Sequence, residues 1–254
     1  KDITVISREE GSGTRDAFTE LTGVLQDDVD KTVDTAEISN STSVVTQSVA
    51  GNDAAIGYIS LGSLDDTVKA VKVDGVEATV DNIKSGDYKI QRPFNIVTKG
   101  EVKELPADFI KFIMSKDGQK IIEDEGYISV NDNAEAYKAS GLKGSITLAG
   151  STSVSPVMEI LADKYKELNS GVTIEIQQTG SGAGIQSTTE GVCDIGMASR
   201  ELKDEETSQG LKSEEIALDG IAVIVNKDNG VEDLSMDQIM KIFTGEITNW
   251  ADVK

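Results

Sequence analysis

Three segments of this chain share one pattern, in which a short apolar strand runs into a turn rich in glycine, serine and threonine and then into a helix. The segments are 2–21, 145–168 and 172–189. The pattern places each turn at a helix N-terminus, where unpaired N–H groups and the positive end of the helix macrodipole face outward. Each of these three hydroxyl-rich helix starts is therefore a candidate site for an anion.

The first segment contains the stretch Ser7–Arg15, which lies between a predicted strand and a predicted helix. The strand is expected at Asp2–Ile6, where β-branched residues alternate, and the helix at Thr14–Leu21, where Phe18 and Leu21 have helical spacing. Taken alone, such a turn is more often an ordinary capped junction than a binding site.

The donors of this first turn suit an oxyanion. Gly11 and Gly13 let the backbone come close to a ligand, and Ser12 and Thr14 add hydroxyl groups. Arg8 supplies a planar fork of N–H donors that matches the geometry of an oxyanion. The turn is thus equipped to hold a small anion.

The other two segments repeat the pattern. A strand at Ser145–Ala149 runs into Gly150–Pro156, and a strand at Val172–Ile176 runs into Gln177–Gly184 before a helix at 185–189. If the three turns converged, they would surround a tetrahedral oxyanion with N–H and O–H donors, so the joint pattern favours a function over three unrelated turns. The helix after the second turn is marked on one face by Val157, Ile160, Leu161, Tyr165 and Leu168.

The composition restricts what such a site does. The 254 residues include 24 Lys and Arg against 45 Asp and Glu, a net charge of -21 that repels nucleic acid and acidic membrane surfaces. An anion site must then act through local dipoles and directed hydrogen bonds, since exposed charges are screened within about 8 to 10 Å. We find no apolar run long enough to span a membrane, no signal-peptide pattern and no lipid-anchor cysteine, and we expect a soluble form.

The absence of histidine excludes several classes of enzyme. Without it there is no Ser-His or Cys-His triad, no His-ligated metal and no imidazole base. Cys193 is the single cysteine, so it forms no internal disulfide. We expect it to pack as a small apolar residue at the start of a strand, the alternative being an accessible thiol.

Four motifs together resemble the phosphate-binding proteins of bacterial phosphate ABC transporters, the PstS family. They are Ser7–Arg15, Gly150–Pro156, Thr179–Gly184 and Asp194–Arg200. The resemblance extends over nearly the whole chain and implies an α/β fold of the type II periplasmic-binding-protein class, with two lobes and a ligand cleft between them. Further matching segments are Ala55–Ile59, Arg92-Pro93, Asp117–Glu123 and Ile247–Trp250.

The order of the motifs differs from the order that the resemblance implies. Members of the family begin with the strand that here starts near Ser145, so the chain looks like a circular permutant whose family termini are joined at 140–145. An engineered sensor scaffold would explain such an order; an unusual numbering or assembly of two pieces is the alternative. On this basis one lobe is 92–222 and the other is 1–91 plus 223–254, with hinge strands near 89–96 and 219–226.

The resemblance also implies which residues contact phosphate. Arg8 would make a charge-assisted bidentate contact with Glu10 supporting its guanidinium, and Ser153 and Gly13 would donate backbone N–H groups. Arg200 stands where well-known members carry an aspartate that accepts the proton of hydrogen phosphate. Either another acceptor, Glu201 or Glu9, takes over this discrimination, or the site uses Arg200 as a second arginine and is less strict about the proton count. The alternative for Arg200 is a surface ion pair with Glu201, Asp204 or Glu205. The full set is Arg8, Ser12, Gly13, Thr14, Thr152, Ser153, Ser181 and Arg200.

The function implied is high-affinity binding of inorganic phosphate by an extracytoplasmic receptor, which in the family is a membrane-anchored lipoprotein. The expected partners are phosphate and the transporter permease; we expect a monomer, no nucleic acid, no cofactor, no metal and no enzymatic activity. The alternatives are a phosphate-ester hydrolase, which would need an activated nucleophile or carboxylate-bound metal, and a receptor for another tetrahedral oxyanion such as sulfate.

Overall fold

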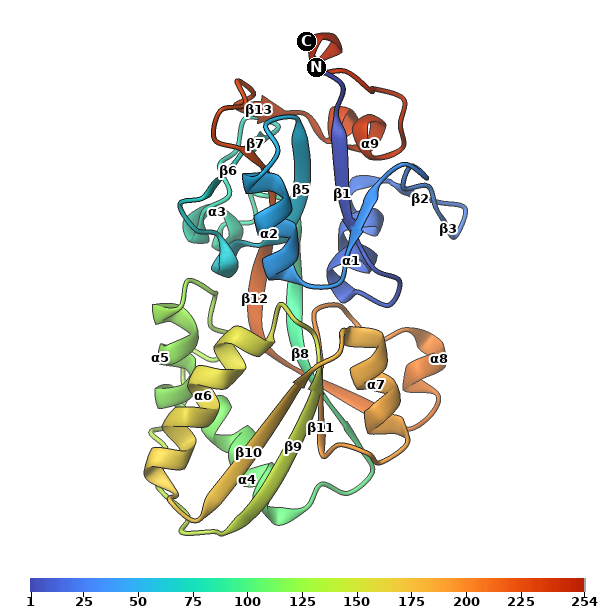
Figure 1. Ribbon diagram of the computed structural model, residues 1–254. Helices are drawn as coiled ribbons and strands as arrows, with labels where there is room; N and C mark the ends of the chain where they lie inside the picture. Colours follow the sequence, from blue (N-terminus) through green and yellow to red (C-terminus); the bar gives the residue numbers. More distant parts are fainter. Residues whose placement is uncertain (254) are drawn as a thin grey trace. The chain divides into compact units, whose positions relative to one another are not determined.

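A computed structural model describes residues 1–253 of the chain as two compact units (Figure 1). One unit comprises Lys1–Gln91 and Asp219–Lys254, and the other comprises Arg92–Leu218. Two strands carry the chain from one unit to the other, β8 (Gln91–Lys99) and β12 (Leu211–Asn226). The second division lies at Leu218–Asp219, inside β12, whereas the sequence placed the lobe boundary at 222–223. Closure of the lobes about these strands stays a prediction.

The first unit is built on a mixed sheet. Strand β1 (Thr4–Arg8) pairs in parallel with β5 (Ala55–Ser60) and with β4 (Glu37–Ser39), and β5 pairs antiparallel with β12. Every residue of β5 is buried, as expected for a central strand. The other elements of this unit are α1 (Gly13–Thr22), β2 (Leu25–Gln26), β3 (Val29–Asp30), α2 (Thr42–Ala50), β6 (Val68–Ala70), β7 (Lys72–Val73), α3 (Val80–Lys84), β13 (Asp233–Leu234) and α9 (Met236–Phe243), with 3-10 turns at Leu61–Ser63 and Trp250–Asp252.

The second unit contains the strand order β10-β9-β11-β8. Strand β9 (Gly144–Gly150) pairs in parallel with β10 (Val172–Gln178) and β11 (Ile195–Ala198), while β8 pairs antiparallel with β11. The carboxyl ends of the three parallel strands therefore meet at one edge. The helices of this unit are α4 (Glu104–Ile113), α5 (Lys116–Asp124), α6 (Ser155–Leu168), α7 (Ser181–Thr189) and α8 (Asp204–Thr207).

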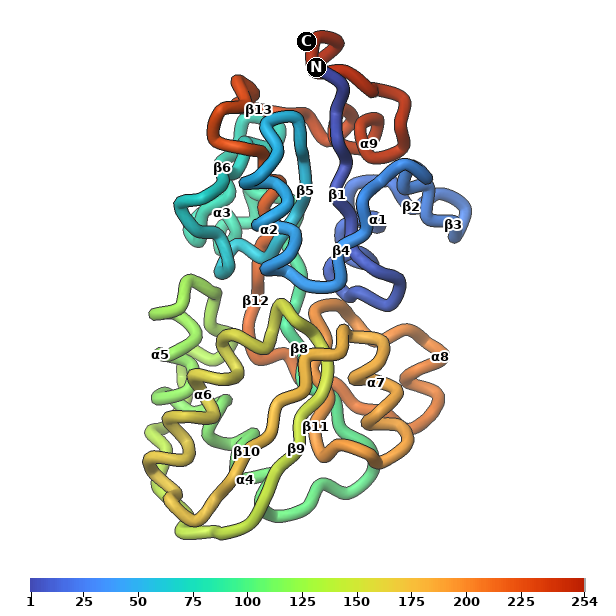
Figure 2. The backbone as a smooth tube through the Cα atoms, viewed as in Figure 1, coloured from blue at the N-terminus to red at the C-terminus, as the bar shows by residue number. Residues whose placement is uncertain are grey.

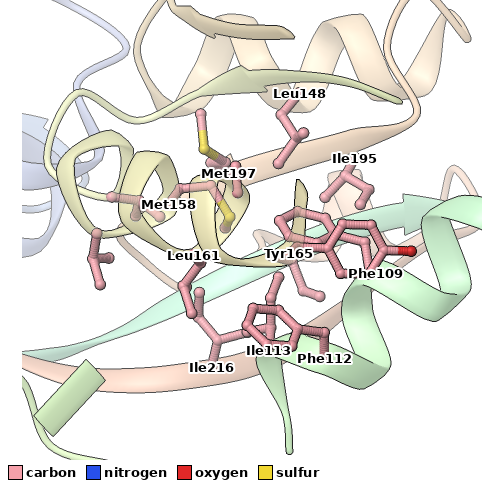
Figure 3. Packing of buried hydrophobic residues seen from close by; sticks show 14 of the residues in the cluster. Phe109, Phe112, Ile113, Leu148, Met158, Leu161, Tyr165, Ile195, Met197 and Ile216 are labelled. Atoms are coloured by element: carbon pink, nitrogen blue, oxygen red, sulfur yellow. The ribbon is translucent and has the colours of Figure 1, made fainter. Parts of the chain in front are cut away.

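Aromatic side chains fill much of both cores. In the second unit Phe109, Phe112 and Tyr165 are completely buried among aliphatic side chains of the sheet and of α6, as Figure 3 shows. In the first unit the ring of Phe18 stacks on Tyr58, with 3.9 Å between centroids, and meets Phe243 edge-on. This apolar packing holds α1 against the sheet at the end of β1.

The structure confirms the mixed α/β class and the three strand–turn–helix segments, with small differences in their extent. The first strand runs to Arg8 instead of ending at Ile6, and two of the helices begin before the residues that the apolar spacing indicated. Leu21, Ile160 and Leu168 are 39 to 40% exposed, because they lie beside the face that each helix buries. Among residues 1–253 no helix is both long and apolar enough to cross a membrane.

Candidate functional site

The turn after β1 forms a loop that we call the arginine loop, residues 8–15. Strand β1 ends at Arg8, the chain turns at Glu10 and Gly11, and Ser12 caps α1 by accepting a hydrogen bond from the backbone N–H of Arg15 at 3.3 Å. Gly11 has a φ of +83°, a conformation that favours glycine. The loop thus presents a helix N-terminus next to the guanidinium of Arg8.

Arg8 is 2% exposed, and its guanidinium is held by the carboxylate of Glu9. Its Nε and Nη2 donate to the two oxygens of Glu9, both at 2.8 Å. The sequence assigned this role to Glu10, but Glu10 occupies the corner of the turn and is exposed. The carboxylate that supports Arg8 in this structure is therefore Glu9.

The remaining predicted residues of the arginine loop lie beside Arg8. Ser12, Gly13 and Thr14 are buried at the start of α1, in the region of positive helix dipole. The structure therefore gathers all four predicted residues of this unit at one strand–helix junction.

Tyr58, in β5, forms hydrogen bonds with the end of β1, where the arginine loop begins. Its hydroxyl hydrogen-bonds Ser7 Oγ at 2.9 Å and accepts from the backbone N–H of Arg8 at 3.3 Å. Burial raises the pKa of Tyr58 to about 12, so the hydroxyl is neutral at physiological pH. Tyr58 lies in a matching motif, Ala55–Ile59, but its contact to Arg8 was not predicted.

The second unit places Thr152 and Ser153 in the turn between β9 and α6. Ser151 organises this turn: its Oγ accepts from the N–H groups of Ser153 at 3.1 Å and Val154 at 3.3 Å, and its own N–H donates to Met197 O at 2.9 Å. The backbone N–H of Ser153, which was predicted to contact the ligand, is thus bonded inside the turn. Thr152 is 6% exposed, at the helix start.

Ser181 begins α7 and is bonded to the segment after β11. Its Oγ accepts from the backbone N–H of Ser199 at 3.1 Å and lies 3.3 Å from Ser199 Oγ. The preceding turn is held to β9, because the N–H groups of Thr179 and Gly180 both donate to Gly150 O at 2.9 Å. These bonds bring three strand ends together, and we call the group Ser151–Ser153, Ser181 and Ser199 the hydroxyl cluster.

Close packing of backbone against backbone makes this convergence possible. A Cβ atom on Gly184 would lie 2.4 Å from both Ala149 O and Gly150 Cα, and one on Gly150 would lie 2.1 Å from Met197 O. Helix α7 can approach β9 because position 184 is glycine, and β11 can approach the end of β9 because position 150 is glycine.

Arg200 follows the hydroxyl cluster and is 7% exposed. Its Nη1 and Nη2 each donate to one oxygen of Glu206 at 2.8 Å, and Nη1 also donates to Glu201 O at 2.9 Å. Burial alone would raise the pKa of the Glu206 carboxyl, but the hydrogen bonds from Arg200 and from the Lys203 N–H lower it below its ordinary value. This ion pair of Arg200 is therefore nearly buried, and Glu206 is not among the acids that the sequence suggested.

Two residues of β8 donate hydrogen bonds to the backbone carbonyls of Ser199 and Arg200, and neither was predicted as part of a site. Arg92 Nη1 donates to Ser199 O at 3.2 Å, and Asn95 Nδ2 donates to Arg200 O at 3.1 Å. The Arg92-Pro93 motif was a signal for the first, whereas nothing in the sequence marked Asn95.

Cys193 is 8% exposed and lies just before β11, as predicted for a small apolar residue. Thr188 Oγ1 lies 3.4 Å from its Sγ, and burial raises the pKa of the thiol. A reactive thiolate is thus disfavoured.

Comparisons with known proteins point to one family. A family model described as the PBP superfamily domain matches residues 1–117 and 135–254. The phosphate-binding protein PstS 2 of Streptococcus agalactiae serotype V is 54% identical over 257 residues, which cover 99% of this chain and 87% of that protein. The PstS 2 of Streptococcus pneumoniae serotype 4 is 50% identical, covering 99% of this chain and 88% of that protein.

A solved structure agrees with these relatives. The crystal structure of a phosphate ABC transporter, phosphate-binding protein from Streptococcus pneumoniae TIGR4 has a TM-score of 0.81, with 49% identity and coverage of 100% of both chains.

The order of segments in this chain is shared with the streptococcal relatives. An alignment that covers 99% of the chain requires the motifs to follow one another in the same order in both proteins. Residues near the two ends of the chain also lie side by side (Figure 2). The N–H of Trp250 donates to Lys1 O at 2.9 Å, and Asp2 forms a β-bridge with Asn249. The unusual order therefore does not require an engineered rearrangement, and permutation relative to other family members stays a prediction.

Proposed function

The chain belongs to the PBP superfamily and to the family of the phosphate-binding proteins PstS, and we propose that it binds inorganic phosphate as the solute receptor of a phosphate ABC transporter. Membership confirms the resemblance drawn from the four sequence motifs and, with the solved structure, the type II fold. One observation carries the proposal most directly: a buried arginine, Arg8, stands at a helix N-terminus lined by hydroxyl groups. This combination provides charge, N–H and O–H donors for an oxyanion.

The proposed ligand contacts come from both units. Arg8 supplies the charge-assisted bond, Ser12, Thr14, Thr152 and Ser181 supply hydroxyls, and the helix starts supply backbone N–H groups. The backbone N–H of Ser153 donates to Ser151 Oγ in this structure, so it must share or exchange that bond to reach the ligand.

The energetics permit tight binding by hydrogen bonds alone. A hydrogen bond to a charged group contributes about 1.5–3 kcal/mol net, and a micromolar Kd corresponds to about 8.2 kcal/mol. A handful of such bonds suffices after the entropic cost of association. The receptor role needs no covalent step, and we propose that the protein is not an enzyme.

Arg200 affects how strictly phosphate is distinguished from sulfate. An arginine donates only, so it cannot accept the proton of hydrogen phosphate as the family's aspartate does. The two candidate acceptors, Glu9 and Glu201, already accept other hydrogen bonds. Both oxygens of Glu9 accept from Arg8, and Glu201 Oε2 accepts from Asn95 at 3.3 Å. We therefore expect weaker rejection of sulfate than an acceptor carboxylate would provide.

As a receptor of a transporter, the protein would act outside the cytoplasmic membrane, with the permease as its membrane partner. The membrane-anchored lipoprotein form belongs to this proposal as the family's mode of attachment. A monomer is sufficient for the proposed binding, since all ligand groups come from one chain.

Isothermal titration with phosphate, arsenate and sulfate tests the proposal. We expect saturable binding of phosphate and arsenate, and weaker binding of sulfate. Arg8→Ala should weaken phosphate binding by about a hundredfold or more, because it removes the buried charge-assisted bonds. Lys164→Ala, which removes an exposed lysine of a surface ion pair, is the matched control. Binding of sulfate but not phosphate, or full affinity after Arg8→Ala, would contradict the assignment.

A further inference from the structure

Arg15 forms a bridge between the arginine loop and a neighbouring hairpin. Its Nη1 donates to the backbone carbonyl of Arg8 at 2.7 Å, and its Nε donates to Asp30 Oδ2 at 2.7 Å. The side chains of Arg15 and Asp30 are only 20% and 29% exposed. One guanidinium thus joins the last residue of β1 to the hairpin formed by β2 and β3.

Asp30 is itself fixed in place. Its Oδ1 accepts from the N–H of Thr32 at 2.8 Å and from Thr32 Oγ1 at 2.6 Å, which leaves Oδ2 directed at Arg15. Burial alone would raise the pKa of Asp30, but the bonds from Thr32 and Arg15 lower it, so the carboxylate is ionised at neutral pH. Asp30 therefore orients the guanidinium of Arg15.

Arg15 is also bound at its backbone, because its N–H donates to Ser12 Oγ, the N-cap of α1. The same residue thus contacts the strand end through its side chain and the helix cap through its main chain. These two points bracket the turn that carries the proposed ligand groups Arg8, Ser12 and Gly13.

We propose that Arg15 and Asp30 are a positioning pair that holds the arginine loop in its binding geometry without touching phosphate. The inference rests on the proposed function and adds residues to the same site. Two donors of Arg15, Nε and one N–H of Nη1, are bonded to Asp30 and to Arg8 O. A loop held at both ends by these bonds loses less conformational freedom when the anion binds.

The charge of Arg15 provides an alternative explanation, since any cation near the loop would attract an anion. The two explanations predict opposite effects of Asp30→Asn. Removing a negative charge near an anion site strengthens binding if simple electrostatics dominates. It weakens binding if the carboxylate is needed to orient Arg15.

The experiment measures the Kd of phosphate by titration for the full chain, for Asp30→Asn, for Arg15→Lys and for the double variant. Lysine keeps the charge but cannot make both directed bonds from one planar group. Glu232→Gln is the matched control, because it neutralises an acid paired with Lys69 in the same unit away from the loop. Thermal unfolding is recorded for every variant.

We expect Asp30→Asn and Arg15→Lys each to raise the Kd about tenfold, the double variant to be little worse than either single one, and Glu232→Gln to leave the Kd unchanged. An unchanged or lower Kd for Asp30→Asn, or an unchanged Kd for Arg15→Lys, overturns the positioning role. If a variant unfolds at the assay temperature, the comparison is made at a lower temperature where its thermal transition shows it folded. Failure of the unchanged chain to bind phosphate would instead refute the proposed function.

Discussion

Glu206 accepts two hydrogen bonds of 2.8 Å from the guanidinium of Arg200, and this bidentate contact fixes the orientation of the arginine that follows the hydroxyl cluster. The pair is nearly buried, with 8% and 13% of the side chains exposed. Removing one partner would leave the other charge in a poorly solvated place, which is more costly than removing both. Arg200 and Glu206 must therefore be exchanged together to test their role.

The double variant Arg200→Asp/Glu206→Gln tests selectivity between anions. It supplies the acceptor carboxylate that the family pattern implies, without leaving Glu206 as an unpaired charge. We expect the ratio of sulfate Kd to phosphate Kd to rise at least about tenfold, a difference of about 1.4 kcal/mol. Competition titrations measure this ratio, and an unchanged ratio would show that position 200 does not contact the ligand.

Tyr58→Phe tests the support beneath the arginine loop. The change removes the acceptor of Arg8 N–H and the partner of Ser7 Oγ, both buried. We expect a loss of about 1–2 kcal/mol of stability and a phosphate Kd several-fold higher. Tyr88→Phe is the control: its hydroxyl donates to Ile221 O at 2.7 Å in the same unit, so it should cost similar stability but leave the Kd unchanged. Equal effects on the Kd would disprove the specific role of Tyr58.

Gly184→Ala tests the close approach of α7 to β9. The new Cβ would meet backbone atoms at 2.4 Å, so the helix and Ser181 at its start must shift. We expect a loss of about 2 kcal/mol of stability or more, together with weaker phosphate binding. Gly230→Ala is the matched control, since its Cβ would meet no atom within 4 Å. Chemical denaturation and titration decide the outcome, and wild-type behaviour of Gly184→Ala would refute the steric argument.

Asp108 predicts an acid-dependent contribution to stability. Its Oδ2 accepts from Tyr137 Oη at 2.5 Å, Tyr165 Oη at 2.7 Å and Ser140 Oγ at 2.8 Å. Burial alone would raise the pKa of Asp108, but these hydroxyl groups lower it below the ordinary value of 3.8. Since the folded pKa is depressed, the stabilisation is complete above the unfolded pKa and is lost as the pH falls through the folded pKa.

Asp108→Asn should therefore lower the free energy of unfolding at pH 7 by about 1–2 kcal/mol, and the difference from the unchanged chain should shrink below about pH 4. Urea unfolding at both pH values measures it. Asp124→Asn, in an exposed i,i+4 pair with Lys120, should change stability by less than about 0.5 kcal/mol. A difference for Asp108→Asn that grew with acidification would contradict the assigned sign.

Much of the candidate site was predictable because its signals are local. A strand end, a hydroxyl cap and a helix start are adjacent in the chain, so the turns at Arg8, Thr152 and Ser181 could be located without coordinates. The same locality made the family recognisable from short motifs. Local signals did not distinguish Glu9 from Glu10 as the partner of Arg8, because that choice depends on how the turn projects each side chain.

The mixed α/β class, the three helix starts suited to an anion and the membership of a phosphate-binding family follow from the order of the amino acids. The groups that support these helix starts become known only from the folded chain: Tyr58 at Arg8, Ser199 at Ser181 and Glu206 at Arg200. These partners come from other strands or from beyond a turn, and their contacts depend on strand register and backbone packing. Sequence periodicity carries information along one element, whereas hydrogen bonds between distant elements exist only once the chain has folded.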